Sequence, residues 1–463
     1  MTRRGGPDAE TATPPLLTPP LPLRGSRLIT SPVSGPLTSP PVSVDAALAA
    51  NADAGVGPGP EAAPEPSAAP ADWRQPLRHT LAALPPERRR RLRAYAATSG
   101  SSVLLRDGSA PPLLDLASND YLGLSHHPAV LAAAAAELER SGLGAGASRL
   151  VSGTRPVHLE LEEALAGWLG RDRALLFPSG FQANLAAVAA LADRHSLVLA
   201  DRLIHHSLLA GVKACGARLQ RFAHNDAADL DRRLSRARRD RPRQRLLVIS
   251  ESLFSMEGSS PDVPALRSCC NRHGAALLLD EAHALGVLGP GGRGLAWSAG
   301  SGDGAPALIS GTFGKAFGSG GAFLAGDGLV IEWLLQHSGA FRYTTALAPP
   351  LAAGALAALS WLQEQERRGQ APGVALLERA RRWRDGLTSA GWARPPGQGP
   401  ILPLLVGDDG RALSLQGRLE AQGLLSVAIR PPTVPAGTAR LRLVLRRDLP
   451  AGSLRRLLSA LEP

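Results

Sequence analysis

The sequence predicts an α/β fold built on a mostly parallel sheet, followed by a smaller α/β domain at the C-terminus. Short apolar runs alternate with longer alanine- and leucine-rich helical segments over most of the 463 residues. The run at 275–279 is apolar at every position, which is typical of a strand buried on both faces of a parallel sheet. Acidic and imidazole side chains follow it directly, at the end of a strand where such sheets bind ligands.

The first 72 residues are predicted to be a disordered extension. They contain prolines throughout and almost no aromatic residue, so they cannot bury enough apolar surface to offset their ordering entropy. Arg3 and Arg4 raise the alternative of a transit peptide, but acidic residues such as Asp8 and Glu10 break that pattern. No secretory apolar region and no uncharged apolar run long enough to span a membrane appears, so we expect a cytoplasmic protein.

The remaining chain is expected to form an N-terminal helix and strand segment at 73–121, a large domain at 122–345 and a small domain at 346–463. A helix-like stretch is expected over 77–92, and the arginine–leucine alternation at 439–445 predicts a strand with one solvated face. Further strands are predicted at 173–177, 197–200, 246–250 and 307–309.

Lys315 stands out because the chain contains only two lysines among its 51 basic residues. Arginine cannot replace lysine where a free amine is needed, because its guanidinium stays protonated. Lys315 lies between small residues, in the stretch Thr312 to Gly318. Lysine amines form Schiff bases with aldehydes, including that of pyridoxal 5′-phosphate, so Lys315 is a candidate for this linkage. The alternative is a solvated surface charge.

Asp280 and His283 follow the buried run at 275–279 and could serve the same cofactor. An aspartate at this edge of the sheet can pair with the pyridine nitrogen and keep the ring an electron acceptor. A phosphate site is predicted where the strand 173–177 leads through Ser179 and Gly180 into a helical run, because helix N-termini bind anions. Ser179 could equally be a plain helix cap, and Thr312 offers a hydroxyl to the same phosphate.

Several motifs together resemble the α-oxoamine synthases, which are pyridoxal-phosphate enzymes of fold type I. The match covers about residues 77–463 and occurs in the expected order. The matching stretches are Asn119 to Leu124, Gly144 to Arg149, Ser152 to Thr154, Asp201 to His205, Phe254 to Gly258 and Ala428 to Pro435. The resemblance implies a large cofactor-binding domain and a smaller C-terminal domain.

The resemblance assigns the cofactor contacts. Lys315 would carry the cofactor, Asp280 would bond the pyridine nitrogen, and His283 with Ser255 would lie near the phenolic oxygen. His205 would stack on the ring, although a capping or core histidine is the alternative, and Glu251 is either an acid behind the site or a surface residue. The phosphate would be held by the Gly180 and Phe181 amides and by the Thr312 hydroxyl.

The resemblance also assigns the substrate contacts. Asn119 and Arg430 would bind the amino-acid carboxylate, and Thr433 lies in a stretch that touches substrate. An arginine of the N-terminal helix would reach the acyl substrate, and both Arg91 and Arg93 are candidates. The family forms homodimers, in which a segment like Tyr343 to Thr345 contacts the phosphate of the neighbouring subunit.

The C-terminal stretch most resembles family members that condense L-alanine with a pimeloyl thioester. The implied products are 8-amino-7-oxononanoate, carbon dioxide and a free thiol, in biotin synthesis, with either coenzyme A or acyl carrier protein delivering the acyl group. Two alternatives stay open: glycine or serine with another acyl-coenzyme A, and a non-catalytic subunit on the same fold. The presence of Lys315 with Asp280 and His283 argues against the second alternative.

The formal charge of +11 does not predict nucleic-acid binding. Aromatic residues make up only 4% of the chain, so stacking platforms are few, and Arg88 to Arg91 is the only tight basic run. The three cysteines show no metal-binding spacing. Adjacent Cys269 and Cys270 on a predicted helix favour buried packing in a reducing compartment, and we expect no metal site.

Overall fold

The computed structural model describes residues 72–98, 102–105, 112–297 and 306–462. The predicted disordered extension lies outside the described residues except for its last position, Asp72. Trp73 to Pro463 form one compact unit. The domain boundary expected at residue 345 stays a prediction.

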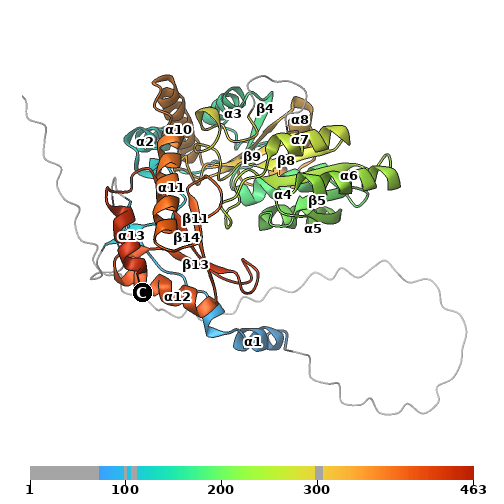
Figure 1. The fold of residues 1–463 in the computed structure, drawn as a ribbon. Helices are drawn as coiled ribbons and strands as arrows, with labels where there is room; N and C mark the ends of the chain where they lie inside the picture. Colours follow the sequence, from blue (N-terminus) through green and yellow to red (C-terminus); the bar gives the residue numbers. More distant parts are fainter. Residues whose placement is uncertain (1–71, 99–101, 106–111, 298–305, 463) are drawn as a thin grey trace, which may run out of the picture. The chain divides into compact units, whose positions relative to one another are not determined.

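A seven-stranded sheet with the strand order β4-β10-β9-β8-β7-β5-β6 forms the centre of this unit (Figure 1). The strands from β9 to β6 are parallel, and β10 alone runs antiparallel to its neighbours β4 and β9. The prediction of a mostly parallel sheet is therefore confirmed. The strands are β4 Arg173–Phe177, β5 Leu197–Asp201, β6 Arg218–Phe222, β7 Leu246–Glu251, β8 Ala276–Asp280, β9 Leu308–Thr312 and β10 Ala322–Gly326.

Helices cover both faces of this sheet, which explains why its strands read as continuous apolar runs. Successive residues of β5 alternate between two cores: Val198 packs with α4, α5, α8 and α9, whereas Leu197 and Leu199 pack with α6 and α7. Cys269 and Cys270 are buried in the second core, as predicted. The helices are α4 Gly180–Leu191, α5 His206–Cys215, α6 Ala227–Asp240, α7 Val263–Arg272, α8 Gly328–His337 and α9 Gly339–Arg342.

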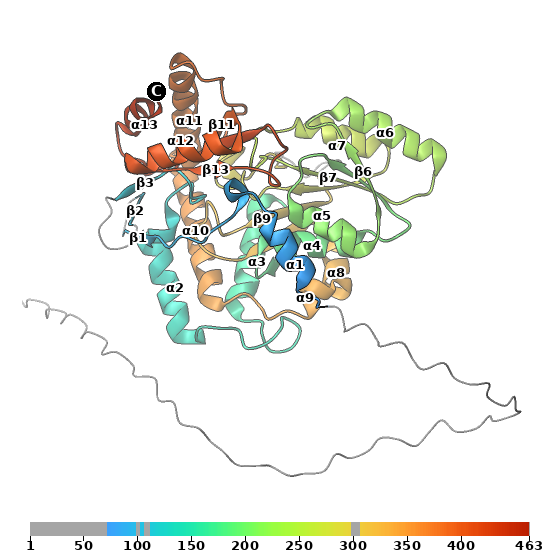
Figure 2. The same ribbon diagram turned by 90° about the horizontal axis from the view of Figure 1, so that it is seen from below.

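Three further helices pack together, and the second of them contacts β4. They are α2 Pro128–Ser141, α3 Pro156–Leu169 and α10 Pro349–Arg367. The C-terminal part has an antiparallel sheet of β11 Ile401–Gly407, β14 Ala439–Val444 and β13 Val427–Ile429. Around it lie α11 Pro372–Ser389, α12 Asp409–Ala421 and α13 Ser453–Leu461, away from α6 and α7 (Figure 2).

The predicted solvated face of β14 is wrong, although the strand itself is where the alternation placed it. Arg442 is buried, and its Nε donates to the Ser255 carbonyl at 2.6 Å. The half-buried Arg440 reaches Glu257 and the Met256 carbonyl. Both arginines thus face protein groups of the loop after β7 instead of water, because the C-terminal part packs against this loop.

The N-terminal segment differs from the single helix expected over 77–92. Helix α1 spans Gln75–Ala82, and the prolines at 85 and 86 interrupt the helix before the short 3-10 turn Pro86–Arg88. The chain then forms β1 Ala96–Ala97, β2 Val103–Leu105 and β3 Leu113–Asp115, and β3 pairs in parallel with β12 Leu424–Leu425. The N-terminal segment therefore shares a sheet with the C-terminal part. No helix among the described ranges is long and apolar enough to cross a membrane.

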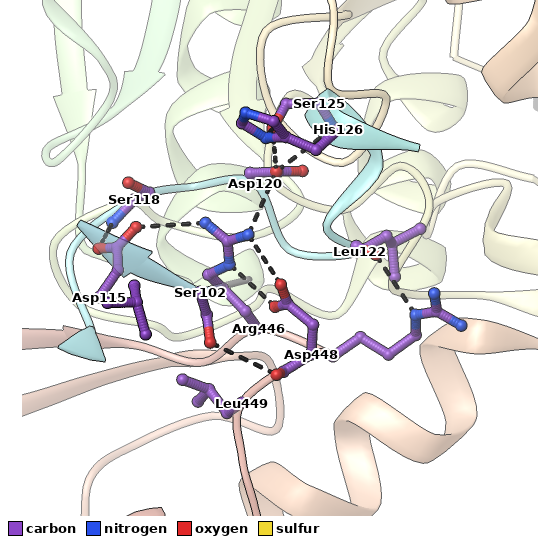
Figure 3. Close-up of polar contacts among 12 residues, drawn as sticks. Ser102, Asp115, Ser118, Asp120, Leu122, Ser125, His126, Arg446, Asp448 and Leu449 are labelled. Atoms are coloured by element: carbon purple, nitrogen blue, oxygen red, sulfur yellow. Dashed lines mark hydrogen bonds and ion pairs between the residues drawn. The ribbon is translucent and has the colours of Figure 1, made fainter. Parts of the chain in front are cut away.

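Arg446, just after β14, joins three carboxylates at this junction (Figure 3). Its guanidinium contacts Asp115 at 3.2 Å, Asp120 at 3.5 Å and Asp448 at 3.0 Å. Asp115 is fully buried and also accepts hydrogen bonds from the amides that follow it. Asp120 in turn accepts from Leu124 N and from the Ser125 hydroxyl. This cluster holds the motif at 119–124 against the C-terminal part.

Candidate active site

A cavity of about 200 Å³ opens at the carboxyl ends of the central strands and collects most of the predicted cofactor residues. Parallel strands place their carboxyl ends at one edge, so residues far apart in sequence meet there. The cavity is lined by Gly180, Phe181, Asn184, His205, Glu251, Asp280, Ala282, His283, Ser310, Gly311, Thr312 and Lys315.

Lys315 lies in a turn that joins β9 to β10. Gly318 closes this turn with a φ of 62°, and a Cβ there would lie 2.1 Å from Ser125 N. Only glycine therefore lets the lysine turn pack against the segment after the 119–124 motif. Desolvation lowers the pKa of Lys315, and the nearby carboxylates of Asp280 and Glu251 oppose this shift. A larger share of unprotonated amine near neutral pH follows.

Asp280 is the last residue of β8 and is buried. Its Oδ1 accepts from Ala282 N at 2.8 Å, and its Oδ2 accepts from Asn184 Nδ2 at 2.7 Å. Both donors fix the orientation of the carboxylate at the floor of the cavity. The asparagine comes from α4, one helical turn beyond Gly180.

His283 follows three residues later and is also buried. Its Nδ1 lies 2.6 Å from the hydroxyl of the fully buried Tyr121. Burial lowers the pKa of His283, and the positive charges of Lys315 and Arg442 lower it further. His283 is therefore neutral at physiological pH.

His205 lies at the N-terminus of α5, where its Nδ1 caps the helix by accepting from Ser207 N at 3.3 Å. Its backbone N–H donates to Glu251 Oε1 at 2.5 Å. Glu251 ends β7 directly beside Asp280 on β8. Burial and this neighbouring carboxylate raise the pKa of Glu251 well above its usual value. Of the two roles considered for Glu251, the surface residue is therefore excluded, and a buried acid behind the site remains.

The start of α4 has the local geometry expected of the anion site that the sequence predicts. Ser179 caps the helix and accepts from Gln182 N at 3.3 Å. The first amides of a helix have no partner within it, and Gly180 and Phe181 occupy these positions. Thr312 lies opposite, since a Cβ on Gly180 would be 3.8 Å from its hydroxyl oxygen.

Besides Ser179 and Arg91, five predicted residues do not line the cavity. Ser255 contributes its carbonyl to Arg442, and Asn119 accepts from Arg442 at 2.9 Å. Arg430 donates to the Glu87 carbonyl. The remaining two make contacts elsewhere: Thr433 accepts from Arg90 at 3.2 Å, and Arg93 pairs with Glu420 at 2.7 Å.

Four residues at or beside the cavity carry no assigned role in the sequence analysis. Asn184 lies on the same helix as Gly180, and Ser207 lies two residues after His205. Helical spacing alone does not reveal that the side chains of Asn184 and Ser207 meet beside the cavity. Tyr121 and Arg442 lie 321 positions apart and meet around His283. Only the folded chain brings them together.

The residues at the cavity fit pyridoxal phosphate. An anionic side chain at the floor matches a pyridinium nitrogen, and unpartnered helix amides with a hydroxyl match a phosphate. Asn184 holds its place in the cavity wall through its NH₂ group, because its buried Oδ1 has no hydrogen-bond partner among the described residues. Lys315 would form the covalent linkage, and the site holds no feature that conflicts with this cofactor.

Comparisons with known proteins agree with this geometry. The model of the aminotransferase class I and II family matches residues 111–461. An 8-amino-7-oxononanoate synthase from Gluconacetobacter diazotrophicus is 46% identical over 370 residues, covering 78% of this chain and 90% of that protein.

Solved structures show the same fold. A serine palmitoyltransferase from S. paucimobilis with bound PLP and myriocin is 28% identical, with a TM-score of 0.73, covering 79% of this chain and 91% of that chain. An 8-amino-7-oxononanoate synthase from Francisella tularensis is 25% identical, with a TM-score of 0.62, covering 75% of this chain and 96% of that chain. The fold is thus that of the fold type I pyridoxal-phosphate enzymes, and pyridoxal 5′-phosphate is the cofactor. The chain therefore belongs to the aminotransferase class I and II family, and within it to the α-oxoamine synthases.

Proposed function

We propose that this protein catalyses the decarboxylative condensation of L-alanine with a pimeloyl thioester. The products are 8-amino-7-oxononanoate, carbon dioxide and the free thiol, and the reaction belongs to biotin synthesis. The observation that carries the proposal is the cavity that joins Lys315 to Asp280 and to the amides of α4, in a chain 46% identical to a synthase of this name.

The proposed roles follow from the protonation state of each side chain. Bound in the cavity, the cofactor supplies an aldehyde that links to amines and a ring that stabilises a carbanion at the amino-acid α-carbon. Lys315, whose pKa is lowered by desolvation, holds or releases a proton near that carbon. Asp280, oriented by Asn184 and Ala282, would pair with the ring nitrogen of the cofactor. Neutral His283 would donate a hydrogen bond near the phenolic oxygen, and His205 would lie against the ring.

The substrate contacts are proposals about side chains at the edge of the site. Asn119 and Arg430 would bind the carboxylate of alanine, and Thr433 would lie in a stretch that touches substrate. Arg430 must first leave the Glu87 carbonyl, its acceptor in this structure. Arg91 and Arg93 are both candidates to bind the distal carboxylate of the pimeloyl chain. In this structure Arg91 is exposed, and Arg93 pairs with Glu420.

Serine with a long-chain acyl thioester is the second candidate. The serine palmitoyltransferase structure superimposes with a TM-score of 0.73, against 0.62 for the Francisella synthase. Substrate choice depends on side chains, and there the sequence favours the synthases, at 46% identity against 28%. We therefore place alanine and the pimeloyl thioester first.

A coupled assay of the purified holoenzyme tests this choice. Alanine, glycine and serine are each paired with pimeloyl-, acetyl- and palmitoyl-coenzyme A, and with pimeloyl acyl carrier protein. Alanine with a pimeloyl thioester should give the highest kcat/KM. A pocket shaped for a methyl group favours alanine over glycine by only ~1–3 kcal/mol, so glycine should be a slow substrate. A higher kcat/KM for serine with palmitoyl-coenzyme A would reject the proposal.

We also propose a cytoplasmic homodimer. Helix α1 has no buried residue, and Trp73, Leu77 and Leu81 are 69%, 53% and 64% exposed. An eight-residue helix is not stable without packing, so a second copy that covers this surface accounts for it. The three cysteines are free, which supports a reducing compartment.

A further inference from the structure

A line of hydrogen bonds connects Asp280 with His205 through two buried residues, Asn184 and Ser207, that the proposed roles leave unused. Asn184 Nδ2 donates to Asp280 Oδ2 at 2.7 Å and to Ser207 Oγ at 3.0 Å. Ser207 Oγ lies 2.7 Å from His205 Nδ1. Asn184 is 3% exposed and Ser207 is fully buried, so water does not compete for the bonds that Asn184 makes with Asp280 and Ser207, whereas His205 itself is exposed.

The carboxylate of Asp280 determines which group is the donor and which is the acceptor in each hydrogen bond between Asp280 and His205. If the Asn184 amide were rotated by about 180°, its oxygen would contact a carboxylate oxygen of Asp280. Both atoms are hydrogen-bond acceptors, so the NH₂ group must face Asp280. The same NH₂ group donates its second hydrogen to Ser207 Oγ. The Ser207 hydrogen is then left for His205 Nδ1, which also accepts from the Ser207 backbone N–H at 3.3 Å.

Two donors that face one ring nitrogen exclude a proton from it. A neutral imidazole whose Nδ1 accepts must carry its hydrogen on Nε2. We propose that Asn184 and Ser207 are positioning residues that form a relay between Asp280 and His205, holding His205 neutral with its proton on Nε2. His205 then offers an N–H donor, and no proton acceptor, to whatever is bound in the cavity.

The surroundings of His205 support this state. Desolvation lowers its pKa, and the positive charges of Lys315 and His206 lower it further, while Asp280 opposes them. The titratable groups that face His205 are Asp280, Lys315, His206, His283 and, through the backbone bond, Glu251. The proposed relay depends on the proposed function in one respect, which is that Asp280 and His205 contact the cofactor.

Histidine titration in the holoenzyme tests the relay. The protein is labelled with ¹³C,¹⁵N-histidine, and the His205 signals among the 11 histidines are identified by their loss in His205→Gln. Ser207→Ala removes the donor to Nδ1, so the pKa of His205 should rise by about one pH unit, the worth of one hydrogen bond. The tautomer with its proton on Nδ1 should become populated.

Asn184→Leu and Asn184→Ser are the decisive variants, because Asn184 does not touch His205. Either one frees Ser207 Oγ to accept a hydrogen bond from a protonated Nδ1, so the pKa of His205 should again rise. Ser207→Thr keeps the hydroxyl and should restore the wild-type titration. Ser250→Ala is the matched control, since it removes an equally buried hydroxyl that has no partner among the described residues.

An unchanged His205 titration and tautomer in a folded Asn184 variant would overturn the relay, even if the melting temperature fell. The titration contains neither alanine nor thioester, so its outcome does not depend on which substrates the enzyme prefers. A failed substrate assay with an intact relay would reject the proposed function alone.

Discussion

Lys315 owes its proposed reactivity to the cavity around it. Replacing it with alanine should abolish the borohydride-reducible linkage to the cofactor and its visible absorption, because no other described lysine reaches the cavity. Lys213→Ala is the matched control, since Lys213 is exposed on α5 and should leave both signals unchanged. Absorption spectra before and after borohydride check this. A reducible adduct that persists in Lys315→Ala and maps to Lys213 would contradict the assignment.

The negative charge of Asp280 is expected to matter more for turnover than the shape of its side chain. Asp280→Asn keeps the size of the side chain but removes the anion beside the ring nitrogen. Cofactor should remain partly bound, while kcat falls by roughly 10²–10⁴-fold, the range for one well-placed polar group. Steady-state kinetics with a cofactor-content measurement separate the two effects. Near-normal turnover would mean that another acid, such as Glu251, serves the nitrogen.

At the scale of elements, β14 and the residues after it fasten the N-terminal motif to the C-terminal part. Arg446→Met should lower the free energy of unfolding by roughly 3–5 kcal/mol, because it leaves the buried Asp115 without its cation. Urea unfolding at pH 7 measures this. Adding Asp115→Asn should recover part of the loss, since the buried charge is then removed. A loss in the double variant equal to the sum of the single losses would show that the two side chains do not interact.

His158, near the start of α3, should make the fold sensitive to acid. Burial lowers its pKa to about 4, and both ring nitrogens are engaged, with Arg155 N at 3.0 Å and the Leu347 carbonyl at 2.9 Å. In the unfolded chain its pKa is ~6.5. Between these values only the unfolded state binds the proton, so stability is present above pH 6.5 and is lost as the pH falls towards 4.

The size of this loss is roughly 2–3 kcal/mol by pH 4.5. His158→Gln can accept and donate at the same two positions without titrating, so its free energy of unfolding should fall less between pH 7.5 and 4.5. Urea unfolding of both proteins at the two pH values gives the difference. An identical fall in both would show that His158 does not carry the effect.

At the scale of the whole molecule, the exposed apolar face of α1 predicts the dimer contact. Leu77→Glu with Leu81→Glu should weaken dimerisation by about 10²-fold or more, since each buried leucine contributes ~1.5–3 kcal/mol. Light scattering over a concentration series measures this. Val374→Glu on α11, where Val374 is 66% exposed, is the control. A wild-type protein that is monomeric and fully active would contradict the homodimer.

The sequence alone predicted the α/β fold, the central strands and most of the cofactor residues. The predictions of the fold and the strands are confirmed, and the cofactor residues stay predictions; all rest on local patterns, since a doubly buried strand must be apolar throughout and a helix N-terminus must follow its cap. Lys315, Asp280, His283 and Gly180 each lie next to such a local signal, at a strand end or a helix start. Their meeting in one cavity follows from the parallel sheet.

Tertiary structure decided what depends on contacts between distant segments. The arginines of β14 alternate like a solvated face, yet Arg442 is buried against Asn119, because the C-terminal part packs onto the 119–124 motif. Whether Asn184 meets Asp280 depends on how α4 lies against the end of β8. The local sequence pattern determines which side chains can be buried. Packing between segments distant in sequence determines which partners those side chains contact, and these partners in turn determine which side-chain atoms of the site carry protons.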